Sequence, residues 1–367
     1  MLKKILMMLM VITVSACGAV LKNPHVNDKE FQRELANQKK LLKDYQNKHK
    51  HSIHKKQMQP NIYAYDNYFG TQMDRMLVNS SEFCKNKMYT VGIRFTDSES
   101  HQYDVYGLTP GFPAQKAGIR KGDKIISING SELTANETFE KLSKNKTNTV
   151  TYLTKNHKKK KVTLNGLVTC QMFLVTSNEK VMNAMADGNT IYMFPELYNF
   201  LGKNDYINTV IAHEIAHNIM SHRARKSMNS STGQLIGLGV NILLGGNQQT
   251  QNDMMQIGHD LSQANSPEFE AEADYMGLYI MKRAGYNINN SPDNWRRMTL
   301  AEKSSDGIGV DTSHPSNPKR FVAIKKAVKE INRKAKNGQP LVPDFQKGSW
   351  AETMNWGEIK NMQKPLY

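Results

Sequence analysis

The sequence predicts an α+β protein, in which a small β-rich domain precedes a mainly helical domain that contains a small sheet. From about residue 88 to residue 168 the chain shows short strands and turns, whereas from residue 167 onward strands alternate with long helices. A chain of 367 residues is comfortable for two domains. Its 39% apolar residues allow ordinary globular cores, and its 22% charged residues argue against a bundle of membrane helices.

The N-terminal stretch is typical of a secretory signal. Lys3 and Lys4 precede an almost wholly apolar run over 5–14, and small residues lead from there to Cys17. This arrangement resembles the bacterial lipobox, which implies cleavage before Cys17 and attachment of lipid to it. The alternative is an ordinary signal peptide with a chance cysteine. Gly18 after the cysteine favours a lipid-anchored protein at the outer membrane, facing the periplasm.

The expected organisation has five parts. They are a lipoprotein signal peptide over 1–16, a tether with N-terminal helices over 17–85, the β-rich domain over 86–168, the helical domain over 169–336 and an irregular C-terminal arm over 337–367. Phe31, Leu35 and Leu42 recur at helical spacing and predict a short amphipathic helix within the tether.

The formal net charge of +16 favours anionic partners such as lipid headgroups, acidic polymers or nucleic acid. A basic, well-solvated surface explains the charge equally well. Export argues against nucleic acid, and the sequence shows no recognition helix, zinc-knuckle spacing or aromatic RNA-binding motif. We therefore expect polypeptide partners and a membrane attachment through lipid, and no nucleic-acid partner.

The run from Thr109 to Gly130 has the turns of a compact β-rich domain. Pro113 starts a short helix and Gly118 ends it, a strand follows over 124–128, and Asn129 with Gly130 forms a hairpin turn. The run closely resembles the bacterial PDZ domain. This resemblance implies a carboxylate-binding loop beside a strand that accepts an added peptide strand. The implied loop residues are Val91, Gly92 and Ile93.

Two cysteines besides Cys17 flank this β-rich domain, whose two ends are expected to lie close together. They are Cys84 and Cys170. In an oxidising compartment we expect them to form a disulfide, and the alternative is a pair of buried free thiols.

A metal site is predicted by the run from Asn208 to Met220, which contains His-Glu-x-x-His in uncharged, apolar surroundings. His213 and His217 lie one helical turn apart, so both imidazoles can bind one zinc ion while Glu214 stands beside it as a base. The alternative is a pair of buried histidines satisfied by hydrogen bonds.

Zinc needs a third protein ligand and an open position for water. Glu270 and Asp274 share one face of a second predicted helix, so one carboxylate can bind the metal while the other orients a histidine. Glu268 and Glu272 are expected to point elsewhere, as part of a solvated acidic surface.

The paired motifs His-Glu-Ile-Ala-His and Glu-Ala-Glu-Ala-Asp resemble those of the gluzincin metallopeptidase family of HtpX, BepA and the CaaX prenyl proteases, over roughly residues 167–335. The resemblance implies that Glu270 is the third ligand and Asp274 its supporting partner. It also implies that His314 lies near the metal, either stabilising an oxyanion or capping the zinc in a resting state. Further residues implied for the site are His222, Arg320, Asn183 and Ala184, the last two on a strand that pairs with peptide.

These patterns together predict a zincin-like endopeptidase with one zinc ion per chain, which hydrolyses unfolded or damaged envelope proteins. Two other functions stay open. One is a zinc-containing chaperone or adaptor with little turnover, against which the intact Glu214 argues. The other is a basic protein that binds the cell wall, which only the positive charge suggests.

Overall fold

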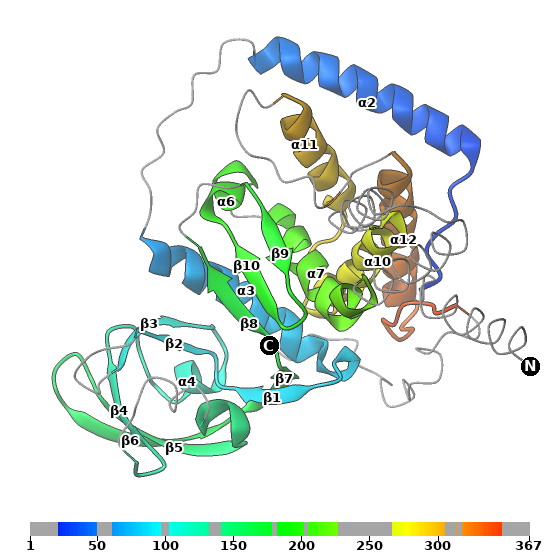
Figure 1. Ribbon diagram of the computed structural model, residues 1–367. Helices are drawn as coiled ribbons and strands as arrows, with labels where there is room; N and C mark the ends of the chain where they lie inside the picture. The colour runs from blue at the N-terminus through cyan, green and yellow to red at the C-terminus, as the bar shows by residue number, and fades with distance from the viewer. Residues whose placement is uncertain are drawn as a thin grey trace, which may run out of the picture.

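The computed structural model describes residues 21–49, 61–96, 103–131, 141–177, 182–201, 205–226, 266–304, 314 and 318–346. A β-rich body and a mainly helical body lie side by side, with the helix α2 on the far side of the helical body (Figure 1). The predicted α+β class is confirmed. Among the described helices, none combines the length and the apolar character that a membrane span requires.

The helical body is built around two buried helices that pack directly against each other. Its helices are α3 (Ile62–Asn79), α6 (Pro195–Leu201), α7 (Asp205–Ile219), α10 (Pro267–Arg283), α11 (Ser291–Ser304) and α12 (Pro318–Lys336). Every residue of α7 over 207–218 is buried, because α3, α6, α10, α11 and a small sheet surround this helix.

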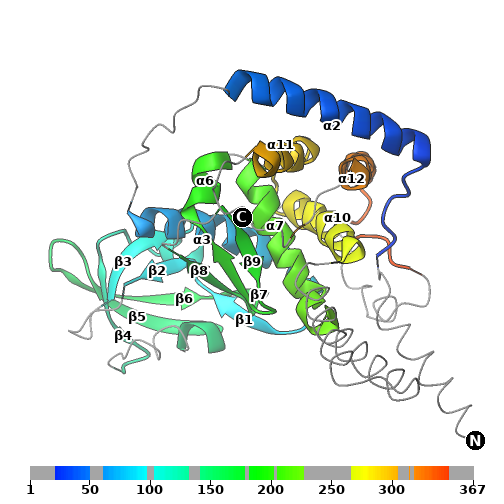
Figure 2. The ribbon, with the colours of Figure 1, turned by 45° about the horizontal axis from the view of Figure 1, so that its top comes forward.

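The small sheet has the strand order β8-β10-β9, with β8 parallel and β9 antiparallel to the central strand. Its strands are β8 (Phe173–Thr176), β9 (Ala184–Ala186) and β10 (Thr190–Met193). The strand β9 lies at the edge, next to α7 (Figure 2). Asn218 on α7 fixes the hairpin between β9 and β10, because its amide accepts from the Gly188 N–H at 2.7 Å and donates to the Thr190 carbonyl at 3.3 Å.

Gly277 allows α10 to approach α7 closely. A Cβ at this position would lie 3.2 Å from the carbonyl carbon and oxygen of Ala212 and from the backbone nitrogen of His213. Backbone atoms inside a buried helix cannot move aside as a flexible side chain can. The absence of a side chain at Gly277 therefore sets the separation of α7, which carries the motif histidines, from α10, which carries the motif carboxylates.

The β-rich body is a five-stranded antiparallel sheet of order β2-β3-β4-β5-β6, joined to the rest by a two-stranded ribbon of β1 and β7. The elements are β1 (Lys87–Thr90), β2 (Ile93–Phe95), β3 (Tyr103–Leu108), α4 (Pro113–Lys116), β4 (Lys124–Ile128), β5 (Thr147–Leu153), β6 (Lys159–Asn165) and β7 (Leu167–Cys170). The predicted turns are present: Gly118 and Gly130 have φ of 92° and 82°, which only glycine adopts without strain.

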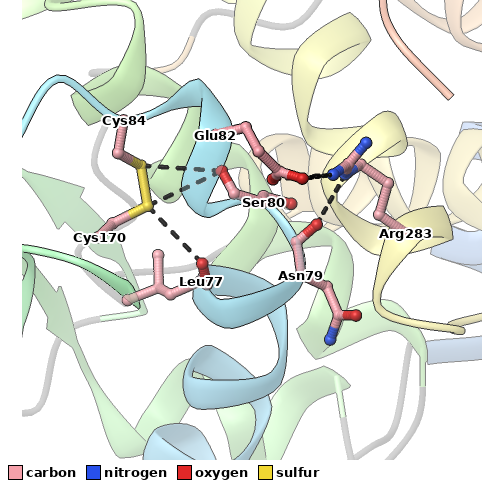
Figure 3. Close-up of a disulfide and its surroundings, with 7 residues drawn as sticks. All are labelled: Leu77, Asn79, Ser80, Glu82, Cys84, Cys170 and Arg283. Carbon is pink, nitrogen blue, oxygen red and sulfur yellow. Dashed lines mark hydrogen bonds and ion pairs between the residues drawn. A yellow bond between two sulfur atoms is a disulfide. The ribbon is translucent and has the colours of Figure 1, made fainter. Parts of the chain in front are cut away.

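The two ends of the β-rich body are tied to the helical body at one place (Figure 3). A disulfide joins Cys84, which follows the short 3-10 helix η1 (Ser81–Phe83), to Cys170 at the end of β7. Beside it, the buried guanidinium of Arg283 on α10 donates to both carboxylate oxygens of Glu82, at 2.8 and 2.9 Å, and to the carbonyl of Asn79 at 2.7 Å.

A second contact between the two bodies centres on Arg94 of β2. Its guanidinium pairs with Asp74 at 2.8 Å and donates to Asn67 at 3.1 Å and Thr71 at 2.9 Å, all on α3. It also donates to Thr109 of its own body at 2.9 Å. The planar guanidinium thus joins a strand of one body to a helix of the other through three hydrogen bonds.

The helix α2 (Asp28–His49) is part of the helical body rather than a free tether, which differs from the expectation for residues 17–85. It lies across α11 and α12 (Figure 2). Glu34 accepts two hydrogen bonds from Arg296 of α11, at 2.7 and 3.0 Å, and Glu30 pairs with Lys326 of α12 at 2.6 Å. The apolar spacing indicates a helix but does not show what the helix packs against.

We expect Gly277→Val to destabilise the protein by about 2 kcal/mol, because overpacking a buried helix contact forces the backbones apart. The midpoint of urea unfolding measures the loss. Glu268→Val is the matched control, since it adds the same β-branched side chain at an exposed position of the same helix. Equal midpoints for the two variants would contradict the role of Gly277 in helix approach.

Candidate metal centre

His213 and His217 project from one face of α7 towards α10, as their spacing predicts. Both are buried, and their Nε2 atoms lie 3.0 Å apart. After α7 ends, Ser221 has a left-handed backbone with φ of 53°, a conformation that non-glycine residues seldom adopt. This turn reverses the chain, so that Nδ1 of His222 lies 2.8 Å from Nδ1 of His217.

The carboxylates come from the first turns of α10. Ser266 caps this helix by accepting from the Phe269 N–H at 3.2 Å, and Pro267 occupies its first turn. Glu270 and Asp274 follow one turn apart on the side that faces α7. The cap therefore fixes where α10 begins, and the contact at Gly277 fixes its distance from α7. Together they determine where these carboxylates lie relative to the histidines.

Four donor atoms converge at one point. Those of His213, His217, Glu270 and His314 all lie within 4.8 Å of one another. Nδ1 of His314 is 3.3 Å from Nε2 of His213 and 3.0 Å from Oε1 of Glu270, and that oxygen is 3.3 Å from Nε2 of His217. Ligand bonds of about 2.0–2.2 Å in a tetrahedron place donor atoms about 3.3–3.6 Å apart. The observed spacing of 3.0–3.4 Å is close to this, so the residues fit a four-coordinate metal ion.

The charges around these atoms favour a cation. Burial alone lowers the pKa of His213, but the carboxylates of Glu270 and Asp274 outweigh it and raise that pKa to about 9. Burial opposes ionisation of Glu270, yet His314 and Arg320 hold its pKa well below the usual range. Glu270 therefore stays ionised in a buried place, and positive charge is drawn to it either as protons on histidine or as a metal ion.

Asp274 and Arg320 support His213 at Nδ1, while its Nε2 faces the other donor atoms. Oδ1 of Asp274 lies 3.0 Å from Nδ1 of His213, which is the partner that a metal-binding imidazole needs to fix its orientation. Arg320 of α12 donates to both oxygens of Asp274, at 2.8 and 2.9 Å, and lies 3.0 Å from Oε2 of Glu270. The ring of Trp295 packs between His213, at 4.8 Å, and the guanidinium of Arg320, at 4.7 Å.

Glu272 supports the second histidine through His222, and its burial corrects the expectation that it belongs to a solvated acidic surface. Its side chain is fully buried. Oε2 lies 3.1 Å from Nε2 of His222 and accepts from Arg225 at 2.8 Å. The ring of His222 stacks on Phe269 with ring centres 4.6 Å apart, and the guanidinium carbon of Arg225 lies 4.5 Å from the centre of the Phe269 ring.

Neither Trp295 nor Glu272 was found by sequence reasoning. The sequence contains no local signal for Trp295, which is 82 residues beyond His213. For Glu272, the available signal is its place inside the motif Glu-Ala-Glu-Ala-Asp. Its helix position, however, is one at which a glutamate usually faces solvent.

Glu214 is buried beside the cluster. One of its oxygens lies 3.6 Å from Nε2 of His314, and the other has no hydrogen-bond partner among the described residues. Burial raises the pKa of Glu214 above the usual value for glutamate. A carboxylate with a vacant acceptor and a raised pKa is suited to exchange a proton with water.

The residues predicted to bind peptide are not among the four residues whose donor atoms converge. Val91 and Gly92 lie between β1 and β2, and Ile93 begins β2, the edge strand of its sheet. Asn183 precedes Ala184, which begins the edge strand β9 next to α7. Cys17, the residue expected to carry lipid, lies outside the described residues.

Two family models match the chain over adjacent segments. The PDZ domain matches residues 90–167, and Peptidase family M48 matches residues 161–328. The chain thus combines a PDZ domain with a domain of peptidase family M48, which confirms the resemblance drawn from the motifs.

Curated relatives agree with this family. The mitochondrial metalloendopeptidase OMA1 of Saccharomyces cerevisiae is 30% identical over 40% of this chain and 43% of its own length. The protein of the same name from Schizosaccharomyces pombe is 26% identical over 44% of this chain and 50% of its own. The chain therefore spans half or less of these relatives. A solved PDZ domain protein from Parabacteroides distasonis is 18% identical over 34% of this chain and 25% of its own, with a TM-score of 0.23, which is too low to support a structural conclusion.

The predicted location at an outer membrane, facing the periplasm, is contradicted by these relatives. The two yeast proteins and a third relative from Arabidopsis thaliana, 27% identical over 41% of this chain and 30% of its own length, are all named as mitochondrial. The residues that indicated the location, which include Cys17, are not among the described ones.

We expect Asp274→Asn to lower the affinity for a divalent metal ion about 10- to 100-fold. The amide offers one acceptor oxygen where the carboxylate offers two, so either His213 or Arg320 loses its partner. Competition for zinc against a chromogenic chelator measures the effect. Asp293→Asn is the control, because Asp293 also pairs with an arginine, at 2.6 Å, but its side chain is 63% exposed. Unchanged zinc affinity in Asp274→Asn would contradict the supporting role.

Proposed function

We propose that the protein is a zinc-dependent endopeptidase that cleaves unfolded polypeptides. One observation carries the proposal: two imidazoles, a buried carboxylate and a third imidazole converge at tetrahedral spacing, with Glu214 buried beside them. The M48 family match and the relatives named as metalloendopeptidases support the same activity. The further expectation of envelope substrates depended on the outer-membrane location, so it is not part of this proposal.

His213, His217 and Glu270 are the residues that would hold the metal. Nitrogen and carboxylate donors at this spacing suit zinc, which binds tetrahedral sets of these ligand types. When bound there, zinc supplies a Lewis acid that polarises a peptide carbonyl and makes a water molecule more acidic.

Glu214 is the proposed general base. Its unpartnered oxygen takes a proton from the attacking water, and the resulting carboxylic acid gives that proton to the departing amine. The raised pKa of Glu214, which burial causes, makes its carboxylate a stronger base than an exposed glutamate, and this favours the first transfer. The buried surroundings exclude competing solvent from this exchange.

For His314 we propose the capping role rather than stabilisation of an oxyanion. Its Nδ1 lies within the group of donor atoms, 3.0 Å from Oε1 of Glu270, where it can bind the metal itself. Four protein donors complete a tetrahedron, and catalytic zinc sites keep one position open. His314 therefore has to leave before a substrate carbonyl can enter.

The peptide is proposed to pair with the edge strand β9 at Asn183 and Ala184. This strand lies next to α7, so a chain added along its free edge runs past the helix that carries His213 and Glu214. Backbone pairing of this kind tolerates many sequences and requires an extended, unfolded substrate. The PDZ domain, with Val91, Gly92 and Ile93, is proposed to capture a C-terminal carboxylate of such chains.

We expect Glu214→Gln to lower kcat on an unfolded protein substrate about 10²- to 10⁴-fold, because the amide cannot accept the water proton. The full chain is tested after zinc loading, and cleavage is followed by the release of new amino termini. Glu268→Gln is the control, since it makes the same change at an exposed position on α10. Equal activity in wild type and Glu214→Gln would reject Glu214 as the base.

A second candidate, a zinc-containing chaperone or adaptor with little turnover, is favoured by the closed set of four donors. The same assay separates the two functions. Zinc binding without cleavage in the wild type, together with suppressed aggregation of the unfolded substrate, would support the adaptor.

We expect His314→Ala to weaken zinc binding and to raise kcat/KM, because the variant lacks the side chain that closes the site. Chelator competition and the cleavage assay, run on the same preparation, measure the two effects. A lower kcat with unchanged zinc affinity would instead show that His314 stabilises the transition state and does not cap the metal.

A further inference from the structure

We infer that the N-terminal segment at Leu21 completes the support of the metal ligand His217, through Glu272 and His222. This inference rests on the metal site of the proposed function and extends it to a segment far from that site in the sequence. Glu272 and His222 would act as positioning residues, which hold His217 in the orientation that binds metal, and the backbone of Leu21 would hold Glu272.

Leu21 lies in the core although it precedes every described helix. Its side chain is fully buried, and it forms an antiparallel bridge with Phe345 from the other end of the described chain. The adjoining N–H of Lys22 donates to the Asp344 carbonyl at 2.8 Å, and Gln346 donates to the Leu21 carbonyl at 3.3 Å. The two segments hold each other in place against α10.

The N–H of Leu21 is directed to Glu272 and not to the bridging strand. It donates to Oε1 of Glu272 at 2.8 Å, across 251 residues of sequence. Oε2 of the same carboxylate faces His222 and Arg225, at 3.1 and 2.8 Å. Each oxygen of this buried carboxylate thus has its own donors, and the carboxylate has one possible orientation.

The hydrogen bonds then specify how His222 meets His217. Nε2 of His222 carries the proton that it shares with Glu272, so its Nδ1 is an acceptor. That acceptor receives the Nδ1–H of His217 at 2.8 Å, which leaves Nε2 of His217 unprotonated among the metal-binding donors. A backbone N–H, a carboxylate and an imidazole therefore fix the tautomer of a metal ligand.

Two features separate this arrangement from ordinary buried polar packing. Phe269 forms a flat support on which His222 stacks at an angle of 8°, so the ring cannot rotate freely. In addition, Glu272 leaves α10 on the side away from Glu270, yet it is fully buried, and Leu21, His222 and Arg225 contact it there.

The first experiment compares Glu272→Gln with Glu268→Gln in the full chain. Glutamine has one acceptor oxygen for the donors on both sides of the carboxylate, so either Leu21 or the pair His222 and Arg225 faces an NH₂ group. We expect Glu272→Gln to lose zinc to a chelator about 10- to 100-fold more readily, as for other groups that orient a ligating histidine. In the cobalt-loaded protein, the d–d absorption bands, which report ligand geometry, should shift or weaken.

The second experiment isolates the backbone N–H of Leu21. Both Leu21→Ala and Leu21→Pro lose the buried side chain, but only proline removes the donor to Glu272. We expect Leu21→Pro to bind zinc more weakly than Leu21→Ala by about tenfold or more. Far-UV circular dichroism and thermal unfolding of the metal-free proteins check that both variants fold.

The outcomes separate this inference from the proposed function. Wild-type protein that binds no zinc would overturn the metal site itself. Wild type that binds zinc, with Glu272→Gln equal to Glu268→Gln in chelator competition and cobalt spectrum, would overturn the inference alone. Equal zinc affinity of folded Leu21→Pro and Leu21→Ala would likewise remove Leu21 from the arrangement.

Discussion

The contact between α7 and α10 is the constraint on which the rest of the centre depends. At Gly277 the helices are too close for even a methyl group to fit without movement, and this closeness places Glu270 beside both histidines. A buried carboxylate is costly unless positive charge compensates it. Arg320 supplies part of that charge, and the remainder is what a metal ion would provide. The burial of Glu270 and the attraction of the proposed site for a metal ion therefore both depend on the packing of α7 against α10 at Gly277.

Support for the two histidines comes from opposite sides and from different parts of the chain. Asp274, fixed by Arg320 of α12, faces His213. Glu272, fixed from the N-terminal segment and from the turn after α7, faces His217 through His222. Glu270, Glu272 and Asp274 occupy alternate positions along α10. One short acidic motif therefore provides the proposed metal ligand and the carboxylates that support both histidines.

Those parts of the fold and the metal site that depend on residues close together in the chain could be predicted from the sequence. The turns of the PDZ domain follow from glycine and proline at particular positions, and the spacing of His213 and His217 follows from the pitch of a helix. Glu272 shows where that reasoning fails. A glutamate two residues after Glu270 lies on another side of the helix, which is ordinarily solvated. Here that side is covered by residues that the sequence does not connect with it.

The sequence by itself determined the α+β class and the residues of the two helical motifs, because helix and turn geometry act over a few residues. The family followed from the resemblance that these motifs carry. The family resemblance already implied that His314 lies near the metal. Only the tertiary structure decided that its Nδ1 lies among the donor atoms, 3.3 Å from Nε2 of His213, that α2 packs on α11 and α12, and that Leu21 reaches Glu272. These contacts depend on which surfaces are left to be buried once the helices have packed. That outcome is a property of the whole chain, and no local pattern encodes it.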